Sequence, residues 1–105
     1  MKGSEKQVAM ARLWRKVLRL TRGRVPVLKA LEVVRAEEKN PAVRDALARV
    51  TGDIGEGKGI SEAFAVHKAL FSPSVVELLK AAEMSGAWDE ILAEIADGLE
   101  EGTFD

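Results

Sequence analysis

The chain has 105 residues, no cysteine and a net charge of −1 at neutral pH. This length supports one hydrophobic core, so a single domain over residues 1–105 is expected and a second is excluded. The lack of cysteine excludes disulfide frameworks and thiolate metal sites. No apolar run approaches the ~18 residues of a membrane-spanning helix, which predicts a soluble chain. The opening MKGS carries no weight because it has the character of a tag remnant.

The small net charge is the sum of a basic first half and an acidic second half of the chain. Residues 1–50 contain thirteen Lys or Arg against five Asp or Glu, whereas residues 51–105 contain three against twelve. Such asymmetry is typical of a basic face for nucleic acid or anionic lipid, of an acidic face for a partner, or of two halves that neutralise each other on folding.

Apolar residues recur at helical spacing in every segment, without the strict alternation of strands. The sequence therefore predicts an all-α fold, a compact antiparallel bundle of about six helices joined as αα-hairpins. The helices are expected over residues 4–23, 26–36, 41–54, 61–67, 73–85 and 88–99. Their predicted starts are Ser4 with Gln7 as a capping box, Pro26, Asn40 before Pro41, Ser61, and Ser72 before Pro73.

The stretch AAEMSGAWDEIL, residues 81–92, is predicted to be a corner between the last two helices. Gly86 supplies the left-handed residue that ends one helix, and the next begins at Trp88. Glu83 lies on the inward stripe of the first of these helices. We expect its carboxylate to accept hydrogen bonds from free backbone N–H groups at the start of the next helix, where the macrodipole favours negative charge.

Two charged stripes are expected on the outer faces of the first and last helices. The basic stripe consists of Arg12, Arg15, Lys16, Arg19 and Arg22, and the acidic stripe of Glu90, Glu94, Asp97 and Glu101. The basic stripe is either a solvated face or a surface near anionic phospholipid. Nucleic acid is disfavoured because no aromatic residues interleave with the arginines. If the stripes meet within a subunit they contribute little stability, and if they meet between subunits they set register and association rate.

Trp14 and Trp88 both lie on apolar stripes. Core packing is their first interpretation, and interface anchoring is the second, because tryptophan is enriched at binding hot spots.

No catalytic constellation is found. His67 stands alone, without a second histidine or any cysteine, which favours a surface role over catalysis. The GEGKGIS segment, residues 55–61, lacks the spacing and the preceding strand of a phosphate-binding loop, so a turn is predicted there. The chain is therefore expected not to be an enzyme.

Several segments carry a resemblance to a known family. The most specific is AEMSGAWDEILAEIADGLE, and VPVLKALEVV, NPAVRDALARV, IGEGKGISEAF and LFSPSVVELLKAAE support it. In this order and spacing they resemble the type II secretion F domain, the cytoplasmic helical module of the GspF/PilC inner-membrane platform proteins. The resemblance covers roughly residues 9–101. Three positions depart from the family pattern: Ala82 and Arg24 stand where glycine is usual, and Trp88 replaces leucine.

The resemblance implies a non-enzymatic scaffold that couples a secretion or pilus ATPase to assembly at a bacterial inner membrane. It also implies a homodimer, contacts with other inner-membrane secretion components, and a membrane-anchored parent protein. Calcium bound by Glu83 and Asp89 near a subunit boundary is a further implication, although two carboxylates supply only a minority of the oxygens that calcium requires.

Family members normally continue into a membrane helix and carry a second copy of this module. The chain ends in EEGTFD, so we expect an excised domain or a freestanding homologue. Two alternatives to the platform function remain, a freestanding soluble adaptor or regulator with the same bundle, and a nucleic-acid-binding helical domain that uses the basic stripe.

Overall fold

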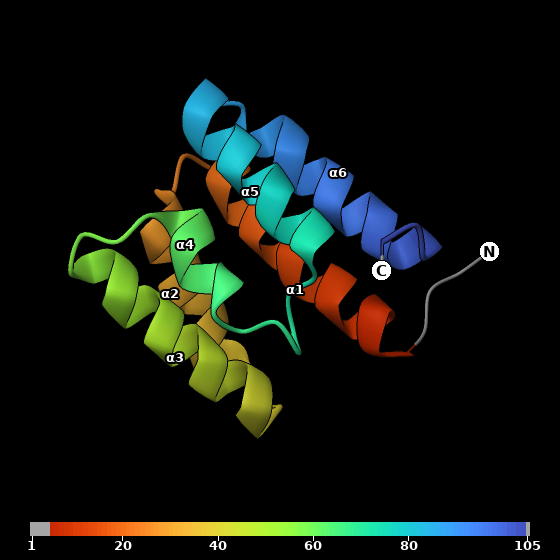
Figure 1. Cartoon of the computed structure of the whole chain (residues 1–105), viewed down its shortest axis with the longest axis horizontal. Coiled ribbons are helices and arrows are strands. Elements are labelled where there is room, and N and C mark those ends of the chain that lie inside the picture. Colours follow the sequence, from red (N-terminus) through yellow and green to blue (C-terminus); the bar gives the residue numbers. More distant parts are fainter. Residues whose placement is uncertain (1–4, 105) are drawn as a thin grey trace.

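The computed structural model of the chain describes residues 5–104, which fold into six α-helices without a strand. The helices are α1 (Glu5–Arg22), α2 (Val27–Glu37), α3 (Pro41–Gly55), α4 (Ile60–Ala65), α5 (Pro73–Ser85) and α6 (Trp88–Glu101). The predicted all-α bundle of about six helices is confirmed in this part of the chain (Figure 1). Ser4, the expected cap of the first helix, lies outside the described residues.

Helix α1 is the central element of the bundle. It packs against α6 and α2, while α2 pairs with α3 and α5 pairs with α6 (Figure 1). The short α4 contacts both α3 and α5. The side-chain amide of Gln7 donates to the carbonyl of Phe104 near one end of α1, and Thr21 bonds to Asp89 at the other. Helices α1 and α6 therefore run antiparallel. No helix within residues 5–104 has the length and apolar character required to cross a bilayer.

An aromatic cluster fills the centre of the bundle, where α1 meets α4 and the segment before α5. The ring centroids of Trp14 and Phe64 lie 5.2 Å apart, and those of Phe64 and Phe71 lie 4.7 Å apart. All three side chains are at most 2% exposed, and burial of such a side chain contributes about 1.5–3 kcal/mol. The predicted core positions of Trp14 and Phe64 are confirmed. Phe71 lies in a segment for which the sequence pattern predicts no core residue.

Three predicted helix boundaries are confirmed by their capping contacts. The side-chain oxygen of Asn40 accepts from the N–H groups of Ala42 and Val43 at 2.9 and 3.2 Å. Ser72 accepts from the N–H of Val75 at 3.4 Å, and Gly86 ends α5 with a φ of 77°. These contacts satisfy backbone groups that helix ends leave without intrahelical partners.

The predicted cap of α4 is wrong by two residues. The helix begins at Ile60 after Gly59, so Ser61 is inside it and is not its cap. A carboxylate from another helix takes the capping role, as described below for Glu83.

The turn after α1 holds Arg24 in the left-handed region, with a φ of 68°. Its N–H donates to the carbonyl of Thr21, and the N–H of Val25 donates to that of Leu20. Together these bonds form a Schellman-type helix end, whose left-handed position is usually glycine because a Cβ is disfavoured there. The resemblance noted in the sequence analysis implies glycine at this position. Arg24 therefore stores backbone strain.

We predict that Arg24→Gly raises the free energy of unfolding by about 0.5–1 kcal/mol, because it removes this strain at the cost of a more flexible unfolded chain. Urea unfolding followed by circular dichroism measures the change. Arg24→Ala is the matched control, since it removes the same side chain but keeps the Cβ and should bring no such gain. An equal gain in both variants would assign the effect to the arginine side chain.

Candidate functional site

The described residues contain no arrangement suited to catalysis by side chains. His67 is half-buried in the segment after α4, and its carbonyl accepts from the N–H groups of Leu70 and Phe71. Within residues 5–104 no group of three or more His, Cys, Asp or Glu side chains is placed to hold a metal ion. Residues 56–59 of the glycine segment form the turn between α3 and α4, with Gly57 at a φ of 103°. Candidate functional groups therefore lie on helix ends and helix faces.

Glu83 joins the end of α5 to the beginning of α4. Its Oε2 accepts from the N–H of Ile60 at 2.8 Å, and its Oε1 accepts from that of Ser61 at 3.0 Å. These are the first two N–H groups of α4, which have no intrahelical partner. The expectation that Glu83 bonds to a helix start is confirmed, but the assignment to α6 is wrong. The expected inward position is also wrong, because Glu83 is exposed at the surface between α5 and α4. The last turn of α5 lies against the start of α4, and Gly59 permits the approach, since a Cβ there would lie 3.2 Å from Oε2.

The pKa of Glu83 is lowered below its ordinary value of 4.5. Partial desolvation acts to raise it, but hydrogen bonds from Ser61 and Ile60 and the nearby charge of Lys80 outweigh that effect. The contacts stabilise the ionised carboxylate, as expected for an anion at a helix N-terminus.

Asp89 joins the beginning of α6 to the end of α1. Its Oδ1 lies 2.9 Å from the hydroxyl of Thr21, which also lies 3.0 Å from the carbonyl of Leu18. A hydroxyl has one proton, so it donates to one of these oxygens at a time. Asp89 is in the first turn of α6, where the helix macrodipole favours its charge.

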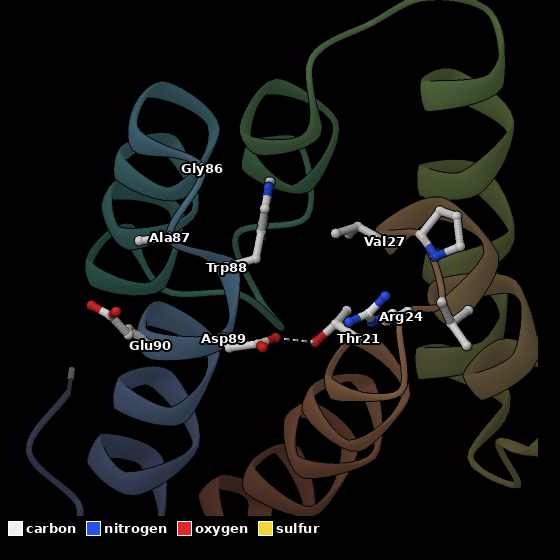
Figure 2. A pocket seen from close by; sticks show the side chains of 10 residues that line it. Thr21, Arg24, Val27, Gly86, Ala87, Trp88, Asp89 and Glu90 are labelled. Atoms are coloured by element: carbon white, nitrogen blue, oxygen red, sulfur yellow. Dashed lines mark hydrogen bonds between the residues drawn. The ribbon is translucent and has the colours of Figure 1, made fainter.

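An open groove lies beside the Asp89 contact. It has a volume of about 560 Å³ and lies between the turn after α1 and the corner before α6. In Figure 2, Asp89 points toward Thr21 while Glu90 points away from it. Trp88 is half-buried and lines this groove, so it remains an interface candidate. Trp14 is 1% exposed and belongs to the core, which leaves it no surface for a partner.

The structure does not bring Glu83 and Asp89 to a common site. Glu83 contacts α4, whereas Asp89 contacts α1. Calcium takes six to eight oxygen ligands, more than either carboxylate offers with its neighbours. Calcium binding by these two residues stays a prediction.

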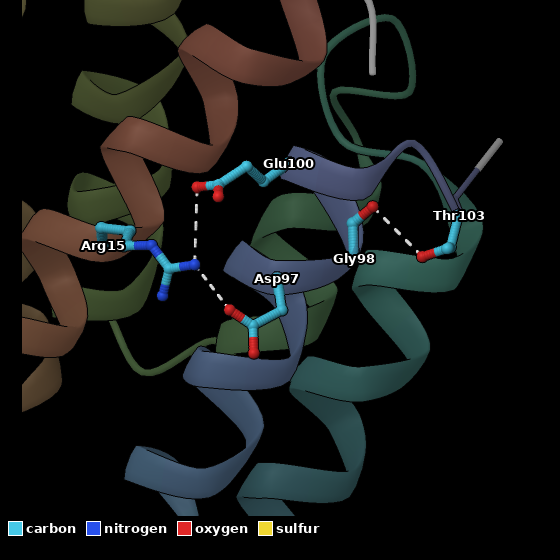
Figure 3. A network of polar contacts seen from close by, with 5 residues as sticks. All are labelled: Arg15, Asp97, Gly98, Glu100 and Thr103. Carbon is cyan, nitrogen blue, oxygen red and sulfur yellow. Dashed lines mark hydrogen bonds and ion pairs between the residues drawn. The ribbon is translucent and has the colours of Figure 1, made fainter. Parts of the chain in front are cut away.

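Within residues 5–104 the basic and acidic stripes meet at one point, the side chain of Arg15. A terminal nitrogen of Arg15 lies 2.5 Å from Oδ1 of Asp97 and 3.5 Å from Oε2 of Glu100, as Figure 3 shows. The hydrogen bond to Asp97 raises the pKa of Arg15 further above its already high value. Both acids are more than half exposed, so each pair contributes only about 0–1 kcal/mol. The sequence prediction included Asp97 but missed Glu100, which lies three residues further along α6.

Most of the two stripes remains outside such contacts. On the basic stripe Lys16 lies 4.0 Å from Glu37 of α2. The residues that form no ion pair within 4.0 Å with another described residue are Arg12, Arg19, Arg22, Glu90, Glu94 and Glu101. All six are exposed. A hollow of about 400 Å³ follows the basic stripe, and one of about 380 Å³ follows the acidic stripe.

An exposed methionine adds to the candidate surfaces. Met84, at the end of α5, is 82% exposed and is one of two large apolar side chains with high exposure in the described chain. Met84 was not singled out from the sequence, because helical periodicity assigns it no role. Its position directly before the Ser-Gly corner is the sequence signal that could have identified it as exposed.

Comparisons with known proteins place these features in a family. Residues 13–103 match the family model described as "Type II secretion system (T2SS), protein F". The chain is 38% identical over 92 residues to the type IV pilus assembly protein PilC of Myxococcus xanthus. It is 33% identical over 90 residues to the type II secretion system protein F of Xanthomonas campestris. These alignments cover 88% and 86% of this chain but 22% of each relative, so the chain spans about a fifth of their length.

We predict that Glu83→Ala lowers the free energy of unfolding by about 1 kcal/mol, the usual effect of losing a helix cap. Urea unfolding at neutral pH measures the loss. Glu77→Ala, an exposed glutamate on the same helix, is the control and should change stability by less than about 0.5 kcal/mol.

The Glu83 contribution also depends on pH. Because the folded-state pKa is lowered, the stabilisation is complete above the unfolded value of 4.5 and is lost as the pH falls through the folded value. The difference between the wild-type chain and Glu83→Ala should therefore shrink below pH 4.5. A difference that is constant across this range would contradict a role for the ionised carboxylate.

Proposed function

Because this chain belongs to the type II secretion system protein F family, we propose that it acts as a scaffold domain in the assembly platform of a type II secretion or type IV pilus system. The PilC and GspF platform proteins are non-enzymatic assembly components. The observation that carries the proposal is the family match over residues 13–103. The relatives include proteins named for pilus assembly and for type II secretion, so the proposal covers both systems.

The proposed mechanism is mechanical coupling between a cytoplasmic ATPase and components at the inner membrane. Coupling of this kind needs a body that moves as a unit, because a force is lost where elements slide past one another. Long-range polar contacts tie helix ends together in this chain: Glu83 ties α5 to α4, and Asp89 ties α6 to α1. These contacts support transmission of a displacement from one helix face to another without any bond made or broken.

We place the domain on the cytoplasmic side of a bacterial inner membrane, as part of a membrane-anchored protein. This placement is supported by the resemblance to the GspF/PilC platform proteins, which implies a parent protein in the inner membrane. Proposed partners are the secretion or pilus ATPase, other inner-membrane secretion components and a second copy of this chain. A closed twofold pair is the commonest arrangement of soluble homo-oligomers.

A freestanding adaptor with the same bundle is the second candidate, and the fold supports it equally well. Nucleic-acid binding is less favoured, because Asp97 and Glu100 lie directly beside Arg15 on the basic stripe. Carboxylates at that position would repel phosphate groups.

The test is direct binding between this chain and the amino-terminal part of the ATPase from the same organism. We expect a measurable heat of binding in isothermal titration calorimetry at micromolar concentrations. A control titration uses the ATPase core without that part. No binding at high micromolar concentration would contradict the platform function and favour the adaptor, whereas salt-sensitive binding to duplex DNA would favour the third candidate.

A further inference from the structure

The basic and acidic stripes lie side by side on neighbouring antiparallel helices. Contacts along α1 and α6 define which residues share a level: Gln7 with Phe104, Arg15 with Asp97, and Thr21 with Asp89. By the same spacing Arg12 lies level with Glu101, Arg19 with Glu94, and Arg22 with Glu90. The line between the two stripes, which we call the seam, is bridged by the Arg15 contacts of Figure 3.

Most charges along the seam form no ion pair within 4.0 Å in the described part of the chain. Arg15 is paired across the seam, but Arg12, Arg19, Glu94 and Glu101 are exposed and form no ion pair with described residues. A surface with one row of positive and one row of negative charges is complementary to its own copy. A twofold axis parallel to the seam turns each basic stripe onto an acidic one and keeps every residue at its level.

We propose that a second copy of this chain docks across the seam through such a twofold axis. Arg12 then faces Glu101 of the partner subunit, and Arg19 faces Glu94 of the partner subunit. The pairing is reciprocal, so each contact occurs twice and the interface closes. The inference rests on the self-association included in the proposed function and identifies its surface.

The neighbouring charges make a second copy a better occupant than an anionic membrane. A lipid surface reaching the basic stripe would also meet the acidic stripe and Glu100, which adds a fifth carboxylate at the seam. Attraction to the five cations and repulsion from the five carboxylates would largely cancel over a Debye length of about 10 Å. A second copy uses charges of both signs.

The seam contact is expected to be weak and salt-sensitive. Exposed ion pairs contribute little individually, and their main effects are on register and association rate. Half-buried Val8 and Phe104, which line the two hollows, add a small apolar contribution. Raising the salt concentration from about 50 to about 500 mM should therefore weaken self-association by about tenfold or more.

The experiment is a charge exchange followed by sedimentation analysis of the full chain. One variant combines Arg12→Glu with Arg19→Glu, and the other combines Glu94→Arg with Glu101→Arg. Neither variant should self-associate, because in each variant the four side chains at positions 12, 19, 94 and 101, which form the proposed contacts, carry the same sign of charge. An equimolar mixture should associate at least as tightly as the wild-type chain. A control variant combines Arg44→Glu with Arg49→Glu, both exposed on α3, and should behave like the wild type.

Circular dichroism verifies that every variant is folded. Three results would contradict docking across the seam. They are a mixture that does not associate, either variant alone associating as tightly as the wild type, and association whose strength does not change with salt concentration. A wild-type chain that stays monomeric at high concentration yet binds vesicles containing phosphatidylglycerol would contradict it as well. These outcomes are independent of ATPase binding, so failure of the seam is distinguishable from failure of the proposed function.

Discussion

Burial of the inner face of α1 is the interaction on which the rest of the structure depends. This helix contacts both α2 and α6, and its Trp14 reaches the aromatic cluster with Phe64 and Phe71. The first and last helices of the chain are thereby held together, and the short α4 is fixed to the core through Phe64. A small domain has few large apolar side chains, so one fully buried tryptophan is a large share of its stabilising energy.

Burial of the inner face of α1 leaves its outer face, with the basic stripe, exposed. Because Leu13, Trp14 and Val17 point inward, Arg12, Lys16 and Arg19 must point outward. The same constraint on α6 buries Leu92 and Ile95 and exposes Glu90, Glu94 and Glu101. The two charged surfaces follow from the requirement that two neighbouring helices bury their apolar sides. A scaffold needs no more than such faces, held at fixed positions by contacts at the helix ends.

Periodicity and local capping signals predicted most of the fold. They succeeded because Asn40, Ser72 and Gly86 act on backbone groups within three or four residues of themselves. They failed at α4, whose cap comes from Glu83, more than twenty residues away along the chain. Phe71 was missed for a related reason: it lies outside any helix, so its burial depends on the path of a connecting segment.

The candidate site was predictable in part. The two stripes follow from helical spacing alone, but their meeting at Arg15 requires knowledge that α1 and α6 are antiparallel neighbours. The assignment of Glu83 and Asp89 to a common calcium site came from the family resemblance, which implies acidic calcium ligands near the corner. In the structure the corner turns them toward different helices, one toward α4 and one toward α1.

The most direct test of the central role of α1 is the free energy of unfolding of Trp14→Ala, measured by urea titration with circular dichroism. The account predicts a loss of about 3–5 kcal/mol, the usual cost of truncating a fully buried tryptophan, and a much smaller loss for the half-buried Trp88→Ala. A Trp14→Ala chain as stable as the wild type would contradict the account, because the helices would then be held together without the buried face of α1.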